Sequence, residues 1–345
     1  MVGLLLPAPP SLPSLPSVQF PGFKSLQIQN PPMPPRPTVD ERLRLLREVR
    51  SDGDLTKIRE TAIKYLADKT NLIIAEAARL IGEFELTGLE PELLAAWKRL
   101  IDHSDPVKAD KGCTAKTAII EALGNLNHDD SEFYLTAIHY RQIEPGWPDA
   151  EDTAENVRAG SAFAISRSQQ LRIVDKLTTF VDYLQGSRAD RINAVKAIAD
   201  TRHESAIPIL RLKLLSGDPE AEVMGTCMSG LLDLAPQRSI PLVAQFLTNP
   251  TENVVYEAAA ALGVCGKPAA VEALINAFKR TGNKDQQRSL LISIGLSRDP
   301  SAINFLISQL EARRDIETVL EALKPSCVYE ETQRRVREVM QKIEG

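Results

Sequence analysis

The sequence predicts an all-α, right-handed solenoid of about seven two-helix repeats, preceded by an extended proline-rich arm. Three observations lead to this prediction. One apolar pattern recurs at a nearly constant interval between residues 192 and 306. Aromatic residues make up only 5% of the 345 residues, as suits closely packed helices rich in alanine and leucine. Eleven prolines stand before residue 38, where they exclude regular helix.

The recurring pattern joins the end of one helix to the start of the next through a short turn. Residues 197–200 (Ala-Ile-Ala-Asp) precede 205–210 (Ser-Ala-Ile-Pro-Ile-Leu). One repeat later, residues 230–233 (Gly-Leu-Leu-Asp) precede 238–243 (Arg-Ser-Ile-Pro-Leu-Val). Two further copies follow, the last of them weaker. Such units pack on their neighbours, so the array can grow without a central core.

The spacing of a large apolar residue near the end of each second helix gives the repeat length. These markers are Leu80, Leu123, Ile165, Ile198, Leu231, Leu262 and Ile294. The first two steps are 43 and 42 residues long, and the later steps are 33, 33, 31 and 32. We place the excess of the early repeats in loops at 103–113 and 143–151. Seven residues before each marker, on the same helical face, stand Ile73, Lys116, Arg158, Arg191, Met224, Val255 and Gln287.

The repeats resemble HEAT repeats, in particular the short bacterial class called PBS-lyase HEAT-like repeats. An A-x-x-L-G or A-x-x-I run, a short turn and A-I-P-x-L carry this resemblance, which covers about residues 54–325. The Val-Arg pair usual at the start of the second helix is present as Val157-Arg158 and replaced elsewhere, for example by Val223-Met224. The resemblance implies a solenoid whose second helices line a concave surface.

The chain divides into an arm and a solenoid. Residues 1–37 form the proline-rich extended arm, and residues 38–345 form the solenoid. Within the solenoid we expect longer repeats over 54–167, regular repeats over 168–311 and a C-terminal cap over 312–345. The last segment is strongly charged, which is typical of a terminal repeat that faces solvent.

The arm has two interpretations. Prolines at this density favour an extended, polyproline II-like chain, as in a plain linker or tail. However, the arm is rich in large apolar residues, Phe20 and Phe23 among them, and nearly free of charge. Disordered segments are typically poor in such residues. We therefore expect a docking arm that lies on the solenoid or on a partner, with a plain tail as the alternative.

The composition argues against several functional classes. The formal net charge of −5 creates no global field that attracts nucleic acid or anionic lipid. No stretch approaches the ~20 apolar residues that span a bilayer, and the N-terminus lacks the basic segment of a signal peptide. The cysteines lie too far apart for a compact zinc motif and fit a reducing compartment. We therefore expect a cytoplasmic protein without a membrane span.

The usual motifs of catalysis and nucleotide binding are absent from the sequence, among them GxGxxG, the Walker loop, HExxH and GxSxG. His128 precedes Asp129 and Asp130, and His203 precedes Glu204, so each group could supply metal ligands. At helix junctions such residues more commonly cap helices and face solvent. We therefore expect no catalytic residue, no metal and no cofactor, and a protein that is not an enzyme.

These features predict a protein–protein interaction scaffold or an accessory subunit that helps to assemble a larger complex. It would bind protein partners through the arm, the concave face and the loop that carries Trp147. A tryptophan at the tip of a Pro-Gly loop has the composition of an interface anchor. Alternatively, it folds back and seals its repeat. The candidate partner-binding residues are Trp147, Tyr140, Arg158, Phe20, Phe23 and Tyr256.

Two other functions follow from the resemblance. Some relatives of this repeat class are E/F-type phycobilin lyases, which attach or remove a chromophore, so a lyase or lyase-like chaperone is the first alternative. HEAT-like DNA glycosylases suggest a nucleic-acid-binding protein as the second, although the acidic balance and only two tryptophans argue against it. The concave face would present residues that are either contacts or merely solvated, namely Arg79, Glu121, Lys196, Tyr256, Glu257 and Arg288.

Overall fold

The computed structural model of the protein describes residues 37–344. The predicted arm, with Phe20 and Phe23, therefore lies outside the described residues except for Pro37. From Val39 onward the chain forms one compact unit. Nineteen α-helices and a single two-stranded sheet account for the regular structure of the described part. The predicted all-α solenoid fold is confirmed.

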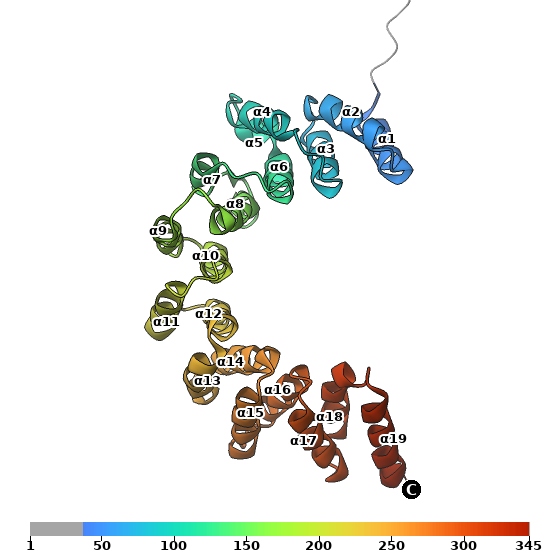
Figure 1. Cartoon of the computed structure of the whole chain (residues 1–345), viewed down its shortest axis with the longest axis vertical. Helices are drawn as coiled ribbons and strands as arrows, with labels where there is room; N and C mark the ends of the chain where they lie inside the picture. The colour runs from blue at the N-terminus through green and yellow to red at the C-terminus, as the bar shows by residue number, and fades with distance from the viewer. Residues whose placement is uncertain (1–36, 345) are drawn as a thin grey trace, which may run out of the picture. The chain divides into compact units, whose positions relative to one another are not determined.

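The helices run along the unit in chain order (Figure 1). They are α1 (Val39–Asp52), α2 (Leu55–Leu66), α3 (Asn71–Glu83), α4 (Glu90–Ile101), α5 (Pro106–Ala109), α6 (Thr114–Asn125), α7 (Ser131–Ala137), α8 (Glu155–Arg167), α9 (Ile173–Tyr183), α10 (Arg188–Asp200), α11 (Ala206–Ser216), α12 (Ala221–Leu234), α13 (Pro236–Gln245), α14 (Glu252–Cys265), α15 (Pro268–Arg280), α16 (Lys284–Leu296), α17 (Pro300–Glu311), α18 (Ile316–Leu323) and α19 (Glu330–Glu344). Short 3-10 helices occupy Lys111–Cys113, Phe246–Thr248 and Lys324–Ser326.

The helices pair into two layers. An inner layer consists of α3, α6, α8, α10, α12, α14, α16 and α18, each packed on the next. Figure 1 shows these helices along the inner side of a curved ribbon and their hairpin partners along the outer side. The described residues thus contain eight hairpins rather than about seven. The additional hairpin is α17–α18, whose second helix is short and lies within the segment expected to be a cap.

Glycine allows the inner-layer helices of the regular repeats to approach closely. A Cβ atom at Gly263 of α14 would lie 2.3 Å from the carbonyl oxygen of Ser293 in α16. At Gly295 of α16 it would lie 2.0 Å from the carbonyl oxygen of Ala322 in α18. No side chain fits at such distances, which explains the glycine after the apolar marker in the repeat pattern. Close backbone packing therefore sets the spacing of these repeats.

Polar side chains begin several helices as the sequence suggests. Asp130 caps α7, because its carboxylate accepts a hydrogen bond from the backbone nitrogen of Phe133 at 3.0 Å. At the start of α10, Ser187 and Asp190 form a capping box in which each side chain accepts from the other residue's backbone nitrogen. Asp190 also reaches back to the preceding repeat, and this second role positions the candidate site.

The longer early repeats differ in detail from the prediction of a loop over 143–151. Helix α7 ends at Ala137, and α8 begins at Glu155. Between them the chain forms an antiparallel hairpin of β1 (Ile143–Glu144) and β2 (Glu151–Asp152) instead of an irregular loop. The helix stops early because residues 140–144 contribute their polar groups to contacts with neighbouring repeats, described below.

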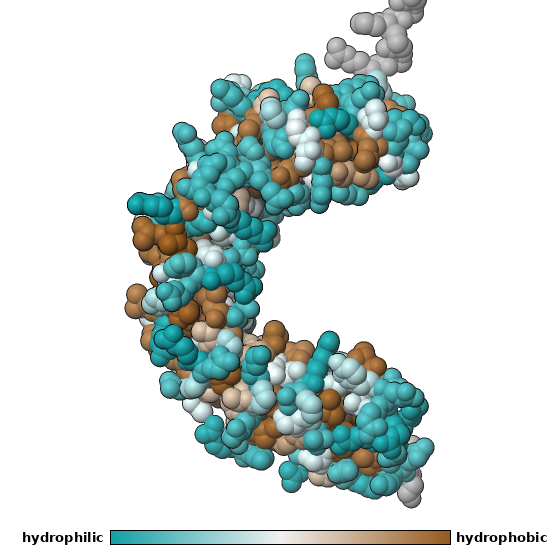
Figure 2. All heavy atoms as spheres, viewed as in Figure 1, coloured by the Kyte–Doolittle hydropathy of each residue, from teal (hydrophilic) through white to brown (hydrophobic). Residues whose placement is uncertain are grey.

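Apolar side chains are also exposed on the outer layer. Figure 2 shows hydrophobic residues gathered over α9 and α11. The exposed ones are Val174 and Val181 of α9 and Leu212 and Leu215 of α11. Cys113 and Cys227 are buried, whereas Cys265 and Cys327 are half-buried, and all four are free. Among residues 37–344, every helix is too short or too polar to cross a membrane.

Candidate functional site

The hairpin between α7 and α8 carries the most exposed large apolar side chain of the described residues. Its strands pair Ile143 with Asp152 and Glu144 with Glu151. Trp147 lies in the connection between them and is 92% exposed. A side chain this exposed covers nothing in its own repeat, so the structure excludes the alternative in which Trp147 seals the repeat.

The other tryptophan, Trp97, packs against its own and the following repeat. Trp97 of α4 is half-buried and packs edge-on against Phe133, with ring centroids 5.3 Å apart. It makes a similar contact with Tyr140 at 6.0 Å. Aromatic pairs in this geometry stabilise packing beyond the area that they bury. The two tryptophans thus have opposite environments, and only Trp147 is available to another molecule.

One side of the hairpin base is held by Glu144. Its Oε1 atom accepts hydrogen bonds from the backbone nitrogen of Gly112 at 2.6 Å, from Gln142 Nε2 at 2.7 Å and from Thr153 Oγ1 at 2.7 Å. Burial alone would raise the pKa of the Glu144 carboxyl, but these donors outweigh burial and lower it. A buried carboxylate therefore fastens β1 both to the segment before α6 and to the segment before α8.

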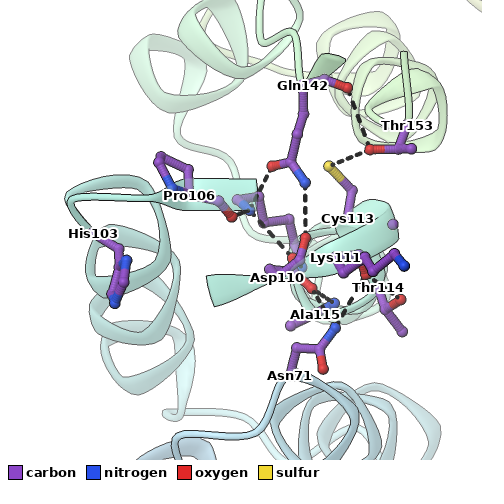
Figure 3. Close-up of polar contacts among 12 residues, drawn as sticks. Asn71, His103, Pro106, Asp110, Lys111, Cys113, Thr114, Ala115, Gln142 and Thr153 are labelled. Atoms are coloured by element: carbon purple, nitrogen blue, oxygen red, sulfur yellow. Dashed lines mark hydrogen bonds and ion pairs between the residues drawn. The ribbon is translucent and has the colours of Figure 1, made fainter. Parts of the chain in front are cut away.

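Gln142 extends this hydrogen-bond network to Asp110 and Lys116 (Figure 3). Its Nε2 donates to the carbonyl oxygen of Asp110 at 2.8 Å, and its Oε1 accepts from Lys116 Nζ at 2.9 Å and from the Tyr140 hydroxyl at 2.8 Å. Lys116 also lies 3.4 Å from the Asp110 carboxylate, and both side chains are completely buried. The Asp110 carboxylate accepts from the backbone nitrogens of Ala115 and Lys116 at the start of α6, each at 2.9 Å.

The other side of the base rests on a second buried cation. Arg158 of α8 is only 1% exposed. Its Nε donates to Asp190 at 2.8 Å, and its Nη1 lies 2.9 Å from Asp152 and donates to the carbonyl oxygen of Tyr140 at 3.1 Å. Arg141 joins the same two carboxylates, at 3.0 Å from Asp152 and 2.8 Å from Asp190. This cluster connects the α7–α8 hairpin to the α9–α10 hairpin.

Hydrogen bonds keep the carboxylates of this cluster ionised. Burial would raise the pKa of Asp190, yet the hydrogen bonds from Arg158 and Arg141 outweigh burial and lower it. For Asp152, burial would also raise the pKa and is outweighed by the hydrogen bond from Arg141 and by backbone donors.

We use the term polar frame for Asp110, Lys116, Gln142, Glu144, Asp152, Arg158 and Asp190.

The polar frame contributes orientation more than stability. Removing two charges from water costs about as much as their pairing returns, so a buried ion pair adds little net stability. Loss of one partner is costly, because the other charge remains buried. A network that is fully hydrogen-bonded also fixes one arrangement of its members. The frame therefore holds the base of the hairpin in one geometry and projects Trp147 from it.

The site has no evident nucleophile. Cys113 lies beside the frame and accepts a hydrogen bond from the Thr153 hydroxyl at 3.6 Å. Burial raises the pKa of its thiol to about 11, so the reactive thiolate is disfavoured. Among residues 37–344 no three His, Cys, Asp or Glu side chains gather as a metal site would require.

The predicted site residues fall into three groups. Trp147 lies exposed at the hairpin, as an anchor requires. Tyr140 and Arg158 were expected beside it at the surface, but Arg158 is buried among carboxylates and Tyr140 is half-buried against Trp97. Both residues support the base of the hairpin. The prediction that Arg158 contacts a partner directly is therefore corrected, because its side chain is buried. Tyr256 lies in a later repeat, on α14, where its hydroxyl donates to Glu252.

Several residues of the polar frame were not predicted as site residues, although the sequence contains a signal for some of them. Asp110 precedes Lys116 by six residues, and Asp152 precedes Arg158 by the same interval. In both cases the cation occupies the position seven residues before the apolar marker. An aspartate at the turn and a cation on the next helix, repeated at one spacing, predicts paired buried charges. The partner Asp190, in the following hairpin, could not be found this way.

Comparison with known proteins agrees with the repeat assignment. Residues 254–280, which cover most of α14 and all of α15, match the family described as PBS lyase HEAT-like repeat. The predicted resemblance is thereby confirmed in one of the regular repeats. The protein is an α-solenoid that contains at least one repeat of this class. No curated protein matches the chain.

Solved structures give weaker likenesses. The complex of CpcE and CpcF of phycocyanin lyase from Nostoc sp. PCC7120 has a TM-score of 0.40 at 18% identity, covering 68% of this chain and 92% of that one. Human deoxyhypusine hydroxylase in complex with glycerol gives 0.29 at 19% identity, with 76% and 91% covered. An engineered protein gives 0.31 at 15% identity, with 87% and 91% covered. Similarity at this level carries no conclusion about activity.

Proposed function

We propose that the protein is a non-enzymatic scaffold or assembly subunit that binds a partner protein through the Trp147 hairpin. The observation that carries the proposal is a 92% exposed tryptophan on a hairpin fixed at its base by buried charges. Tryptophan is enriched among the residues that dominate binding energy in interfaces. An anchor that is already ordered loses little conformational freedom on binding, which favours affinity.

The surroundings of Trp147 fit an interface. Ile143 of β1 is also exposed and adds apolar area on the same hairpin. Arg141 keeps nearly half of its side chain in solvent while it pairs with Asp152, so the apolar anchor is flanked by charge. Interfaces commonly combine an aromatic centre with such a polar rim. In this proposal the concave face and the arm of residues 1–37 supply further contacts to the same assembly.

The proposal is tested by comparing two variants that each remove an exposed apolar side chain. Trp147→Ala removes the proposed anchor, and Val328→Ala removes a residue that is 72% exposed elsewhere on the solenoid. Tagged full-length proteins would be used to capture partners from a lysate of the source organism, quantified by mass spectrometry. We expect at least one specific partner to be lost with Trp147→Ala and retained with Val328→Ala. Equal recovery of all specific partners by both variants would contradict the proposal.

A chromophore lyase or lyase-like chaperone is the second candidate, because residues 254–280 match the PBS lyase HEAT-like repeat. Co-expression of the full chain with a bilin and its acceptor protein separates the two. A coloured complex, or bilin attachment that depends on this chain, would favour the lyase function. A colourless preparation and unchanged attachment would favour the scaffold.

A further inference from the structure

A groove of about 820 Å³ lies on the inner layer, lined mainly by α10, α12 and α14. Its floor is made by small residues one turn apart on α12, Gly225 and Ser229, and by Ala261 of α14. Val264 provides an exposed apolar contact at its edge. Ser229 and Ala261 are small enough for a polypeptide backbone to approach them closely.

The groove also contains a carboxylate in an unusual position. A Cβ atom at Gly225 would lie only 2.1 Å from Oε2 of Glu257 and 2.8 Å from its Cβ. The side chain of Glu257 therefore occupies the space that the absent side chain of Gly225 leaves open above α12. It is half-buried, and within residues 37–344 no hydrogen bond or ion pair reaches it. Burial accordingly raises the pKa of its carboxyl.

The remaining charges of the groove separate into paired and unpaired groups. Asp200 pairs with Arg167 at 3.1 Å, and Arg202 pairs with Asp233 at 2.6 Å. Two lysines of the groove make no such contact within the described part of the chain, namely Lys196, at the opposite side from Glu257, and Lys267. A half-buried carboxylate without a partner is unfavourable, and an incoming cation would relieve that cost.

We propose that this groove binds an extended segment of a partner protein, which presents a lysine or arginine to Glu257 and an acidic residue to Lys196. The inference deepens the proposed scaffold function by giving the chemistry of a second contact surface. The Glu257 carboxylate lies over α12, one step between neighbouring inner helices from α10, or about 8–10 Å at ordinary packing distances. An extended chain advances about 3.3 Å per residue. The two charges of the segment should therefore stand about two or three residues apart.

An unbiased peptide selection tests this proposal with the purified full chain. A displayed library of random twelve-residue peptides would be selected on the immobilised protein. We expect enrichment of sequences with one basic and one acidic residue about two or three positions apart. Absence of any enriched charge spacing would overturn the proposal.

Variants then assign the binding to the groove. A labelled peptide from the selection should bind Glu257→Gln about tenfold more weakly than wild type, because its cation loses a partly desolvated partner. Lys196→Glu should weaken the same peptide, and reversing the peptide's acidic residue to lysine should restore binding to that variant. Glu272→Gln, which alters an exposed carboxylate of α15 outside this groove, should leave affinity unchanged. Unchanged affinity in both groove variants would overturn the proposal.

The result is separable from the test of the hairpin. Trp147→Ala should bind the selected peptide as wild type does, because Trp147 does not line the groove. A failure of peptide binding with intact Trp147-dependent capture would reject the groove alone. Loss of the selected peptide in Trp147→Ala would place its binding at the hairpin and would likewise reject the groove.

Discussion

The early repeats around residues 103–167 and the regular repeats after residue 188 differ in the charge of the side chains between their stacked inner helices. Glycine permits close approach in both regions, as Gly263 does against Ser293 and Gly160 does against Ile120. In the early repeats, Lys116 and Arg158 stand seven residues before the apolar marker, lie buried in the interior and pair with aspartates. Arg191 marks the transition, since it pairs with Asp218 while remaining 18% exposed. Beyond it, the same position holds Met224 and Val255.

This difference shows that stacking does not require the buried charges. The regular repeats form the same two layers with Met224 and Val255 at the corresponding position of α12 and α14, so a hydrophobic alternative exists within the same chain. Replacement of buried ion pairs by apolar residues is often neutral or stabilising. The early repeats nevertheless keep charges where they contact the hairpin base. Their distinctive contribution is therefore the fixed orientation of the hairpin that carries Trp147.

The largest expected effect comes from breaking the polar frame. Asp190→Ala leaves Arg158 buried with only part of its charge compensated, so we expect the free energy of unfolding to fall by about 3–5 kcal/mol. Urea unfolding followed by circular dichroism would measure the loss. The matched control is Asp233→Ala in the regular repeats, where an exposed pair with Arg202 is worth at most about 1 kcal/mol. Similar losses in the two variants would contradict the distinction between the regions.

A smaller effect is expected from crowding the regular repeats. Gly263→Ala places a methyl group against the carbonyl of Ser293, and overpacking of this kind costs about 1–3 kcal/mol. Gly124→Ala on α6 meets no neighbouring atom within 4 Å, so the higher helix propensity of alanine should stabilise it by up to about 1 kcal/mol. Thermal unfolding of the two variants gives the comparison. Destabilisation of equal size at both glycines would argue against close backbone packing as the cause.

Acid should loosen the early repeats first. The pKa values of Glu144, Asp152 and Asp190 are lowered in the folded protein, because their hydrogen bonds outweigh burial. Their contribution to stability is therefore present above the ordinary carboxyl pKa of about 4 and is lost as pH falls through the lowered values. Hydrogen-exchange protection factors between pH 6 and pH 3 should fall in α6–α8 before they fall in α14–α16. Simultaneous loss would contradict a special role of these carboxylates.

The smallest effect on stability should accompany the largest proposed effect on binding. Trp147→Ala removes a side chain that touches little of the protein, so the melting temperature should change by no more than about 1 °C. Trp97→Ala removes a half-buried ring packed on Phe133 and Tyr140 and should cost about 3 kcal/mol. Differential scanning calorimetry of both variants checks this contrast. A marked loss of stability in Trp147→Ala would indicate that Trp147 seals its own repeat and would contradict its function as an exposed anchor.

The sequence reveals the repeat because helix packing is periodic. The spacing of Ile198, Leu231 and Leu262 requires only that equivalent helices pack on one another, and the structure follows it. The location of the excess residues was also predictable, since insertions fall in the connections. The eighth hairpin was not, because α18 is too short to carry the full pattern.

The site was less predictable for a physical reason. Trp147 was recognised from its loop, but exposure depends on where the rest of the chain lies. Arg158 seemed suitable for a surface because arginine usually is exposed. Its burial depends on Asp190, which stands 32 residues later and reaches it only when the next hairpin has stacked. The spacing of Asp152 and Arg158 indicates one partner, but the contact with Asp190 depends on tertiary structure and leaves no local pattern.

The central claim is that the polar frame holds the hairpin rigid while Trp147 remains exposed. Backbone ¹⁵N order parameters of Gly146, Trp147, Asp149 and Ala150 test it most directly, measured by NMR relaxation in the wild type and in Glu144→Ala. We predict values near 0.85, typical of rigid backbone, in the wild type, and values below about 0.6 once Glu144 no longer joins Gly112, Gln142 and Thr153. Values below about 0.6 in the wild type, or no change in Glu144→Ala, would contradict the account.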